Sequence, residues 1–349
     1  MTAEDHVQTP SDRAISRRRF LTRSAGTVAA FGVAAAVGVE LRGRERPEPW
    51  DHSVFAPPGT AQVAVLQASS YDGDLENVVL GGLRAIGADV KGARVVLKPN
   101  MVEYDPGAVI NTDPRLVAAS VAALRRLGAA QVVVAEGPGH RRDTGYVVEA
   151  SGLASHLRDA GASFVDLNVA RAGEVPLAAA YTQLGTLWLP TAITSADVVV
   201  SMPKVKTHHW AGVTLSLKNC FGCLPGRMYG WPKNILHWQG IDASILDIAA
   251  TVRPDLVIAD GIVGMQGDGP ISGTPAPLGA VIVADDPVAA DVTITRMMGF
   301  DPEKLPYLME AGRFLGQADP AKIRPVAEDP AAVTMAFAPA PGFDDLRSS

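Results

Sequence analysis

The chain has 349 residues, of which 47% are hydrophobic and 19% charged, so it is long and apolar enough to bury a full core and is not a disordered chain. Its formal net charge is −6, and eight of its 31 basic residues lie within the first 46 positions. The remainder therefore carries a net charge of about −9, which excludes the basic face that a nucleic-acid-binding protein needs. Its two cysteines are too few for a disulfide scaffold or a four-thiolate iron–sulfur cluster.

Residues 1–40 have the pattern of an export signal. Ser16-Arg17-Arg18-Arg19-Phe20-Leu21 resembles the twin-arginine translocation motif, and an apolar stretch follows from Ala25 to Val39. That stretch is short and interrupted by glycines, unlike a spanning helix. The pattern predicts export in the folded state with the twin-arginine translocase as partner. The destination is the periplasm or the outside of the cell, with a membrane anchor if the signal stays uncleaved. The alternative is a basic patch before an ordinary helix.

The body of the chain alternates between short β-branched runs and helical patterns. Residues 41–60, with four prolines, are predicted to be a linker, 61–318 an α/β domain and 319–349 a C-terminal tail. The alternation predicts a mostly parallel sheet with flanking helices, as one large domain or two closely packed lobes. Strands are expected near 62–67, 94–97, 131–135, 163–167, 197–201, 256–259 and 280–284, and helices near 74–86, 113–127, 145–158, 241–252, 287–298 and 303–315.

Polar clusters follow several of these strands, where the chain leaves the sheet. In open α/β sheets that edge binds ligands. The clusters predict a small-molecule site. The residues expected to contact substrate are Lys98, Asn100, Lys204, Lys206, Asp260 and Asp291. Asp291 has the alternative role of opening a helix.

The segment between Val198 and Ile241 contains no acidic residue, although it holds four lysines, one arginine and three histidines. In an acidic body this is a local excess of positive charge, which concentrates carboxylate or phosphate ligands. We therefore expect a small anionic ligand at this segment. The alternative is a solvated basic loop without a ligand.

Histidines and cysteines near this segment predict catalytic and metal-binding roles. His140 and His208 are expected to act as acid or base, because the pKa of histidine lies near neutrality. Cys220 and Cys223, with His237 and either His208 or His209, have the residue types of a two-cysteine, two-histidine metal shell. The alternatives are that the two thiols pack in the interior or pair as a disulfide.

Five ordered motifs resemble the family called domain of unknown function 362. They are K-P-N at 98–100, N-T-D-P at 111–114, S-M-P-K-V-K-T-H at 201–208, T-L-S-L-K-N at 214–219 and D-G-I-V-G-M-Q-G-D-G-P at 260–270. Members of that family are often joined to iron–sulfur modules, which this chain cannot build from its own cysteines. The resemblance implies a redox partner protein and no established activity.

The segment 204–226 is also similar to the cofactor-lysine segment of the lactate racemase family, whose nickel-pincer nucleotide is attached to a lysine. This resemblance implies that Lys218 is the tether, His237 a metal ligand, and His208 and His140 the two acid/base groups.

The leading hypothesis is an exported enzyme, dependent on a metal or a nickel-pincer-like cofactor, that acts on a small anionic substrate. One alternative is a non-catalytic protein that binds a ligand or cofactor for a partner. The other is an electron-transfer component of an iron–sulfur partner system.

Overall fold

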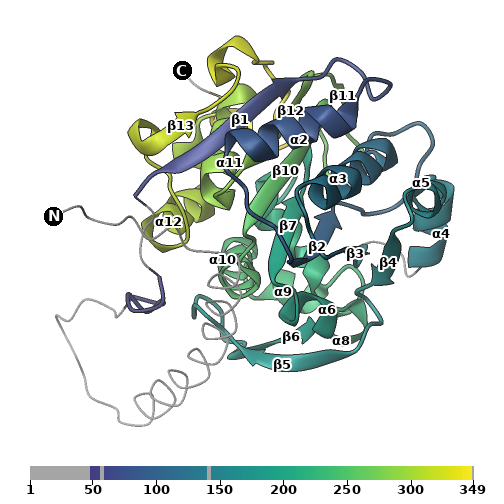
Figure 1. Ribbon diagram of the computed structural model, residues 1–349. Helices are drawn as coiled ribbons and strands as arrows, with labels where there is room; N and C mark the ends of the chain where they lie inside the picture. The colour runs from purple at the N-terminus through teal and green to yellow at the C-terminus, as the bar shows by residue number, and fades with distance from the viewer. Residues whose placement is uncertain (1–47, 56–58, 140–142, 348–349) are drawn as a thin grey trace, which may run out of the picture.

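The structure is a computed structural model, which describes residues 48–55, 59–139 and 143–347 (Figure 1). Its centre is a mixed, mostly parallel sheet with the strand order β13-β1-β12-β10-β7-β2-β3-β4. In this order the strands are Ile323–Pro325, Ala61–Gln67, Ala280–Ala284, Leu256–Gln266, Val198–Met202, Arg94–Pro99, Gln131–Glu136 and Ser163–Asp166. Only β12 runs against its neighbours among these strands. The predicted α/β class is therefore confirmed.

Helices cover both faces of the sheet (Figure 1). One face packs against α2, α3, α4 and α5 and the other against α10, α11 and α12. These helices span Leu75–Ala85, Pro114–Arg126, Thr144–Ala150, Leu153–Asp159, Ile241–Val252, Pro287–Met297 and Pro306–Phe314. Successive residues of β2 alternate between the two hydrophobic cores, with Val95 and Leu97 in one and Val96 in the other, as the pleat of a strand requires.

Local sequence signals explain most of these boundaries. The side chain of Asp113 caps α3 by accepting a hydrogen bond from the Arg115 amide, and Pro114 occupies the first helical turn. The single helix expected over 145–158 is divided into α4 and α5, because Gly152 adopts a φ of +80° between them. The hairpin of β5 (Ala172–Pro176) and β6 (Thr186–Pro190) was not predicted.

The acid-free segment between Val198 and Ile241, called the basic segment below, folds into strands and short helices. They are β8 (Lys204–His208), β9 (Gly212–Thr214), α7 (Ser216–Asn219), η1 (Cys220–Cys223), α8 (Gly226–Tyr229) and α9 (Asn234–Trp238). β8 pairs with β10 and with β9, so it extends the sheet beyond the end of β7. Lys206 is fully buried. The interpretation of this segment as a solvated loop is therefore wrong.

Segments at both ends of the α/β domain pack onto it. The ring of Trp50 stacks on Phe314, and Phe337 is buried beyond β13. The remaining short elements are α6 (Thr191–Thr194), β11 (Thr274–Ala276), η2 (Pro302–Lys304), η3 (Pro320–Lys322), η4 (Pro330–Ala332) and η5 (Asp344–Leu346). The predicted export signal, residues 1–40, lies outside the described residues. Across the described ranges, no helix has the length and apolar character needed to span a bilayer.

Candidate functional site

A cavity of about 320 Å³ opens where the ends of β2 and β3 meet the basic segment, to which β8 belongs. Seven of the residues singled out from the sequence line it: Lys98, Asn100, Lys206, His208, His209, Lys218 and His237. The sheet brings them together because the parallel strands β2, β3 and β7 end at the same edge. Residues that the sequence analysis did not select also line it, among them Glu136, Thr214, Asn219, Phe221 and Lys233.

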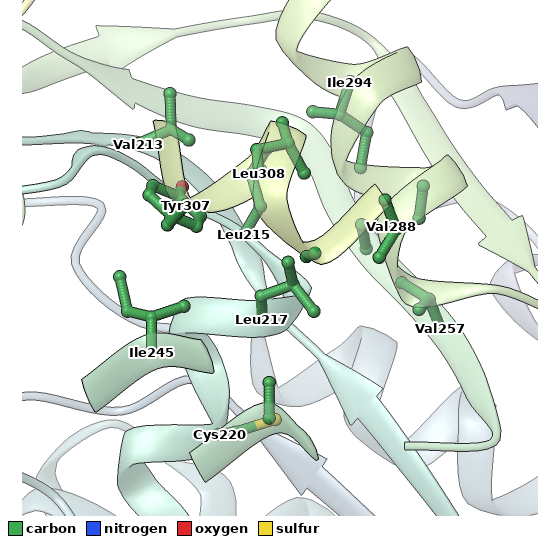
Figure 2. Close-up of a cluster of buried hydrophobic side chains, with 14 of the residues drawn as sticks. Val213, Leu215, Leu217, Cys220, Ile245, Val257, Val288, Ile294, Tyr307 and Leu308 are labelled. Carbon is green, nitrogen blue, oxygen red and sulfur yellow. The ribbon is translucent and has the colours of Figure 1, made fainter. Parts of the chain in front are cut away.

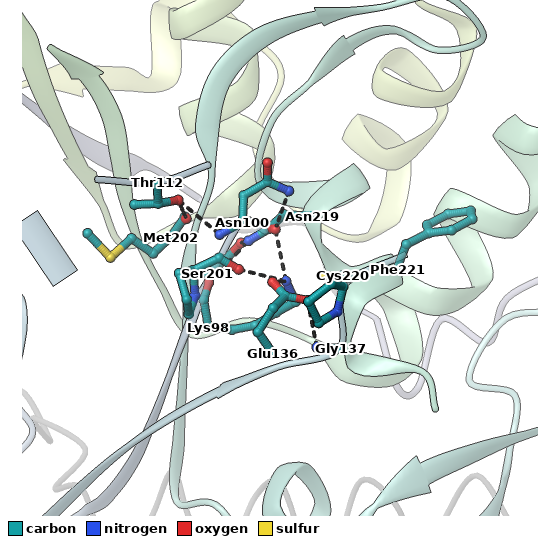
Figure 3. A network of polar contacts seen from close by, with 12 residues as sticks. Lys98, Asn100, Thr112, Glu136, Gly137, Ser201, Met202, Asn219, Cys220 and Phe221 are labelled. Atoms are coloured by element: carbon teal, nitrogen blue, oxygen red, sulfur yellow. Dashed lines mark hydrogen bonds and ion pairs between the residues drawn. The ribbon is translucent and has the colours of Figure 1, made fainter. Parts of the chain in front are cut away.

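A buried network forms one wall of the cavity (Figure 3). The ammonium of Lys98 donates to Glu136 Oε2 at 2.5 Å, to Asn219 Oδ1 at 2.9 Å and to the Pro99 carbonyl at 2.8 Å. All three N–H donors of Lys98 are thus used. Gly222 is required beside this pair, because a Cβ built there would lie 2.6 Å from Lys98 Nζ. The network positions α7 rather than presenting Lys98 to a ligand.

The other three lysines of the cavity differ in how many donors they use. Lys206 donates to the carbonyls of Ile110 and Pro270, and Lys233 to those of Gly137 and Phe221. Within the described part of the chain, the Lys218 ammonium makes no hydrogen bond, and its Nζ lies 3.8 Å from the centroid of the Phe221 ring. Lys218 therefore keeps all three donors for a ligand.

Burial and mutual repulsion lower the pKa of these cations. Burial, reinforced by the charges of Lys233 and Lys98, lowers the pKa of Lys218 to about 7. Burial also lowers the pKa of Lys233 to about 8, and holds that of Lys206 well below its ordinary value. Burial and the Lys218 charge lower the pKa of His237 to about 4. An anion in the cavity would relieve this repulsion.

The neighbouring histidines present different nitrogens to the cavity. His208 Nδ1 accepts hydrogen bonds from the amides of Trp210 and Ala211, at 3.0 and 3.3 Å. Neutral His208 therefore carries its proton on Nε2 and acts as a donor. His209 Nδ1 lies 2.9 Å from the Gly269 carbonyl, which only accepts, so Nε2 of neutral His209 keeps its lone pair.

His208 was expected to act as acid or base, and this geometry leaves it the donor role. The nitrogen of His208 that could take a proton is already bound by two amides, and burial holds its pKa well below the ordinary value. His209, expected only as a metal ligand, has the available lone pair. His140, the second expected acid/base group, lies outside the described residues.

Three buried polar atoms of cavity residues have no hydrogen-bond partner within the described residues. They are Asn100 Oδ1, Thr214 Oγ1 and His237 Nδ1. Buried polar groups in folded proteins are nearly always paired, because an unpaired one costs free energy. All three atoms lie within the cavity wall with almost no accessible surface, so they are not open to a ligand in the cavity.

Three predicted substrate-binding residues lie away from the cavity and need correction. The Lys204 ammonium binds Asp260 Oδ2 at 2.9 Å and the hydroxyl of half-buried Tyr71 at 2.8 Å, and Lys204 and Asp260 are both buried. Asp291 accepts from the amides of Ser216 and Leu217 at 2.7 and 3.0 Å. Lys204 and Asp260 therefore stabilise the sheet, and Asp291 caps α7, which carries Lys218.

The predicted cysteine–histidine metal shell is wrong. Cys220 and Cys223 are buried thiols that belong to the hydrophobic core, and Figure 2 shows Cys220 beside Leu217 and Ile245. Neither cysteine lines the cavity that holds His209 and His237. In the described ranges no three histidine, cysteine or carboxylate side chains are arranged to hold a metal ion. The alternative, that the thiols pack in the interior, agrees with the structure.

Comparisons with known proteins agree with the motifs. Residues 95–296 match the family described as "Domain of unknown function (DUF362)". The chain is 32% identical over 258 residues to the "Thylakoid-associated protein sll1697" of Synechocystis sp. The aligned region covers 70% of this chain and 77% of that protein. The lactate racemase apoprotein of Thermoanaerobacterium thermosaccharolyticum superposes with a TM-score of 0.43 at 13% identity, over 70% of this chain and 57% of that one. The family match spans more than half of the sequence, and the chain belongs to the DUF362 family.

Proposed function

We propose that this chain is an enzyme that binds a small anionic substrate in the cavity and moves a proton on it. The observation that carries the proposal is the charge of the cavity wall. Four lysines line it, whereas Glu136 is the one carboxylate among its described lining residues, and Lys98 already pairs with Glu136. The remaining three lysines are neutralised by no acidic partner there, so a carboxylate or phosphate ligand supplies the missing negative charge.

The two histidines support proton transfer rather than binding alone. His209 Nε2 can accept a proton, and His208 Nε2–H can donate a hydrogen bond to an oxygen on which negative charge develops. Their ring centroids lie 5.0 Å apart, so one small ligand can reach both. A binding protein that only captures an anion has no need for this division of roles.

Export is a further part of the proposal that rests on the sequence, and a resident cofactor in the cavity is an alternative to a free Lys218 amine. The twin-arginine motif supports export, and the relative in Synechocystis is named as thylakoid-associated. Among the residues that the structure describes, the histidine, cysteine and carboxylate donors do not fit a metal ion held by side chains alone. The resemblance to lactate racemase implies the alternative of a cofactor tethered to Lys218 and bound by His237, which both line the cavity. Intact mass and elemental analysis of protein from its native host test whether such a cofactor is present.

Calorimetry tests anion binding directly, with inorganic phosphate and oxalate as probes. At pH 8 the parent protein should bind at least one probe and take up protons, because the anion raises the pKa of Lys218 from about 7. Lys218→Met should weaken binding by at least about tenfold, the loss of one charge-assisted contact. Lys91→Met removes an exposed lysine outside the cavity and should change nothing. Unchanged binding by Lys218→Met, or no binding by the parent, would contradict the proposal.

Exchange of C–H hydrogens tests catalysis. Parent protein is incubated with pyruvate, lactate and malate in D₂O, and deuterium incorporation is followed by NMR. His209→Gln should abolish exchange while probe binding persists, since the amide cannot take up the proton. Binding of phosphate or oxalate without exchange on pyruvate, lactate or malate would instead support the non-catalytic alternative.

A further inference from the structure

We infer that Lys218 is a nucleophilic amine that forms an imine with the carbonyl carbon of a small oxo acid bound in the cavity. The inference rests on the proposed anion-binding function and adds to it a substrate class and a covalent step. It follows from the position of Lys218, from the groups around its ammonium and from the donors left on the neighbouring lysines.

Lys218 is held rigidly, but its amine is unbound. It lies on α7, whose first amides are capped by Asp291, while Asn219, next in sequence, is fixed by the Lys98 ammonium. Within the described residues no oxygen accepts a hydrogen bond from Lys218 Nζ, which faces the Phe221 ring. A structural lysine at such depth is expected to bind carbonyls or carboxylates, as Lys206 and Lys98 do.

The surroundings favour the neutral amine, which is the form that attacks a carbonyl carbon. Removal from water and cationic neighbours are two environments that activate a lysine nucleophile. Lys218 has both, from its burial in the cavity wall and from the charges of Lys233 and Lys98. Its pKa of about 7 agrees with this, since a large share of the amine is then unprotonated at neutral pH.

The neighbouring groups select an oxo acid as the partner. Lys206 and Lys233 each use two of their three N–H donors on main-chain carbonyls, which leaves one each for a substrate carboxylate. Because Lys218 lines the same cavity, a carbonyl group next to that carboxylate can meet its amine. The cavity volume of about 320 Å³ restricts the substrate to a small molecule.

The step is balanced without an oxidant or a reductant. Lys218 Nζ attacks the carbonyl carbon and a C–N bond forms. The C–O bond then breaks, and both amine hydrogens leave with the oxygen as water, which gives C=N. His209 Nε2 accepts a proton from the attacking nitrogen and returns it to the oxygen that leaves, while His208 Nε2–H donates a hydrogen bond to that oxygen.

Reductive trapping tests the inference on the full chain. The intact mass is measured first, and the protein is then treated with pyruvate and cyanoborohydride at pH 7 and mapped by peptide mass spectrometry. Lys218 should be labelled at least about tenfold faster than the exposed Lys91, which serves as internal reference. Lys218→Arg should lose this label and keep the positive charge. His209→Gln should slow labelling of Lys218 while phosphate still binds.

Two outcomes would overturn the inference. If Lys218 is labelled no faster than Lys91 while phosphate binds with the expected proton uptake, the imine fails and the anion site stands. If the untreated protein already carries a mass adduct at Lys218, the amine holds a resident group and does not attack substrate. Failure of phosphate and oxalate to bind would instead remove the proposed function itself.

Discussion

Replacing Lys218 with methionine should stabilise the fold at acidic and neutral pH, although it removes a functional group. The pKa of Lys218 is about 7 in the fold against an ordinary value of 10.5. At about 1.4 kcal/mol per pH unit, this difference corresponds to at most about 5 kcal/mol of unfavourable free energy for keeping the ammonium charged, because the Lys218 side chain is only partly buried. Loss of the contact with the Phe221 ring costs about 1–2 kcal/mol. The expected net gain for Lys218→Met is at most about 3–4 kcal/mol below pH 7.

The gain must shrink as the pH rises, and this distinguishes the charge effect from a packing effect. Between about pH 7 and 10.5 the unfolded chain holds a proton on Lys218 that the folded chain has released, so the parent becomes more stable with increasing pH. The variant lacks this contribution. Urea unfolding at several pH values from 6 to about 10, followed by tryptophan fluorescence, measures the difference, with Lys91→Met as control. A pH-independent difference, or a less stable variant at pH 6, would refute the assignment of Lys218 as a buried, unpaired cation.

Three further predictions concern the supports of the site and the export signal. Gly222→Ala should cost about 3–5 kcal/mol in urea unfolding, because the new methyl group separates the buried ion pair beside it, whereas Gly139→Ala, with open space around it, should change stability by less than about 0.5 kcal/mol. Asp291→Asn should lower the free energy of unfolding by about 1–3 kcal/mol, because its single amide oxygen cannot replace two carboxylate oxygens at the amides of Ser216 and Leu217. It should also slow the reductive labelling of Lys218. Replacement of Arg17 and Arg18 by lysine should leave the protein folded but not exported, as cell fractionation would show; unimpaired export would contradict the signal assignment.

Much of the fold follows from local signals in the sequence. Apolar runs gave the central strands, and the Asp113–Pro114 pair placed the start of α3, because a cap and a preset φ act within a few residues. The β5–β6 hairpin was missed because its strands are only partly buried and contain little apolar alternation. β8 was missed for the opposite reason, since its lysines and threonine are polar and yet completely buried. Their burial depends on distant carbonyl oxygens that the local pattern does not contain.

The residue types of the site were predictable, whereas the roles of the residues were not. The absence of acidic residues between Val198 and Ile241 predicted a ligand site there, because basic side chains without acidic partners attract anions, and several residues of this segment line the cavity. The same segment contains both Lys233 and Arg227. Nothing in the sequence of the segment indicates that Lys233 lines the cavity and Arg227 does not. Asp291 was read as a contact to substrate, but only the packing of α11 against α7 shows that it caps a helix.

The different proton positions on His208 and His209 show what decides chemistry beyond residue type. The two rings are adjacent in sequence and line the same cavity, and either could act as a base in isolation. The turn after β8 directs two amides at Nδ1 of His208, while the loop after β10 directs a carbonyl at Nδ1 of His209. Each ring must therefore carry its proton on the opposite nitrogen from its neighbour. The backbone, rather than the histidine side chains themselves, thus places one donor and one acceptor in the cavity that Lys218 also lines.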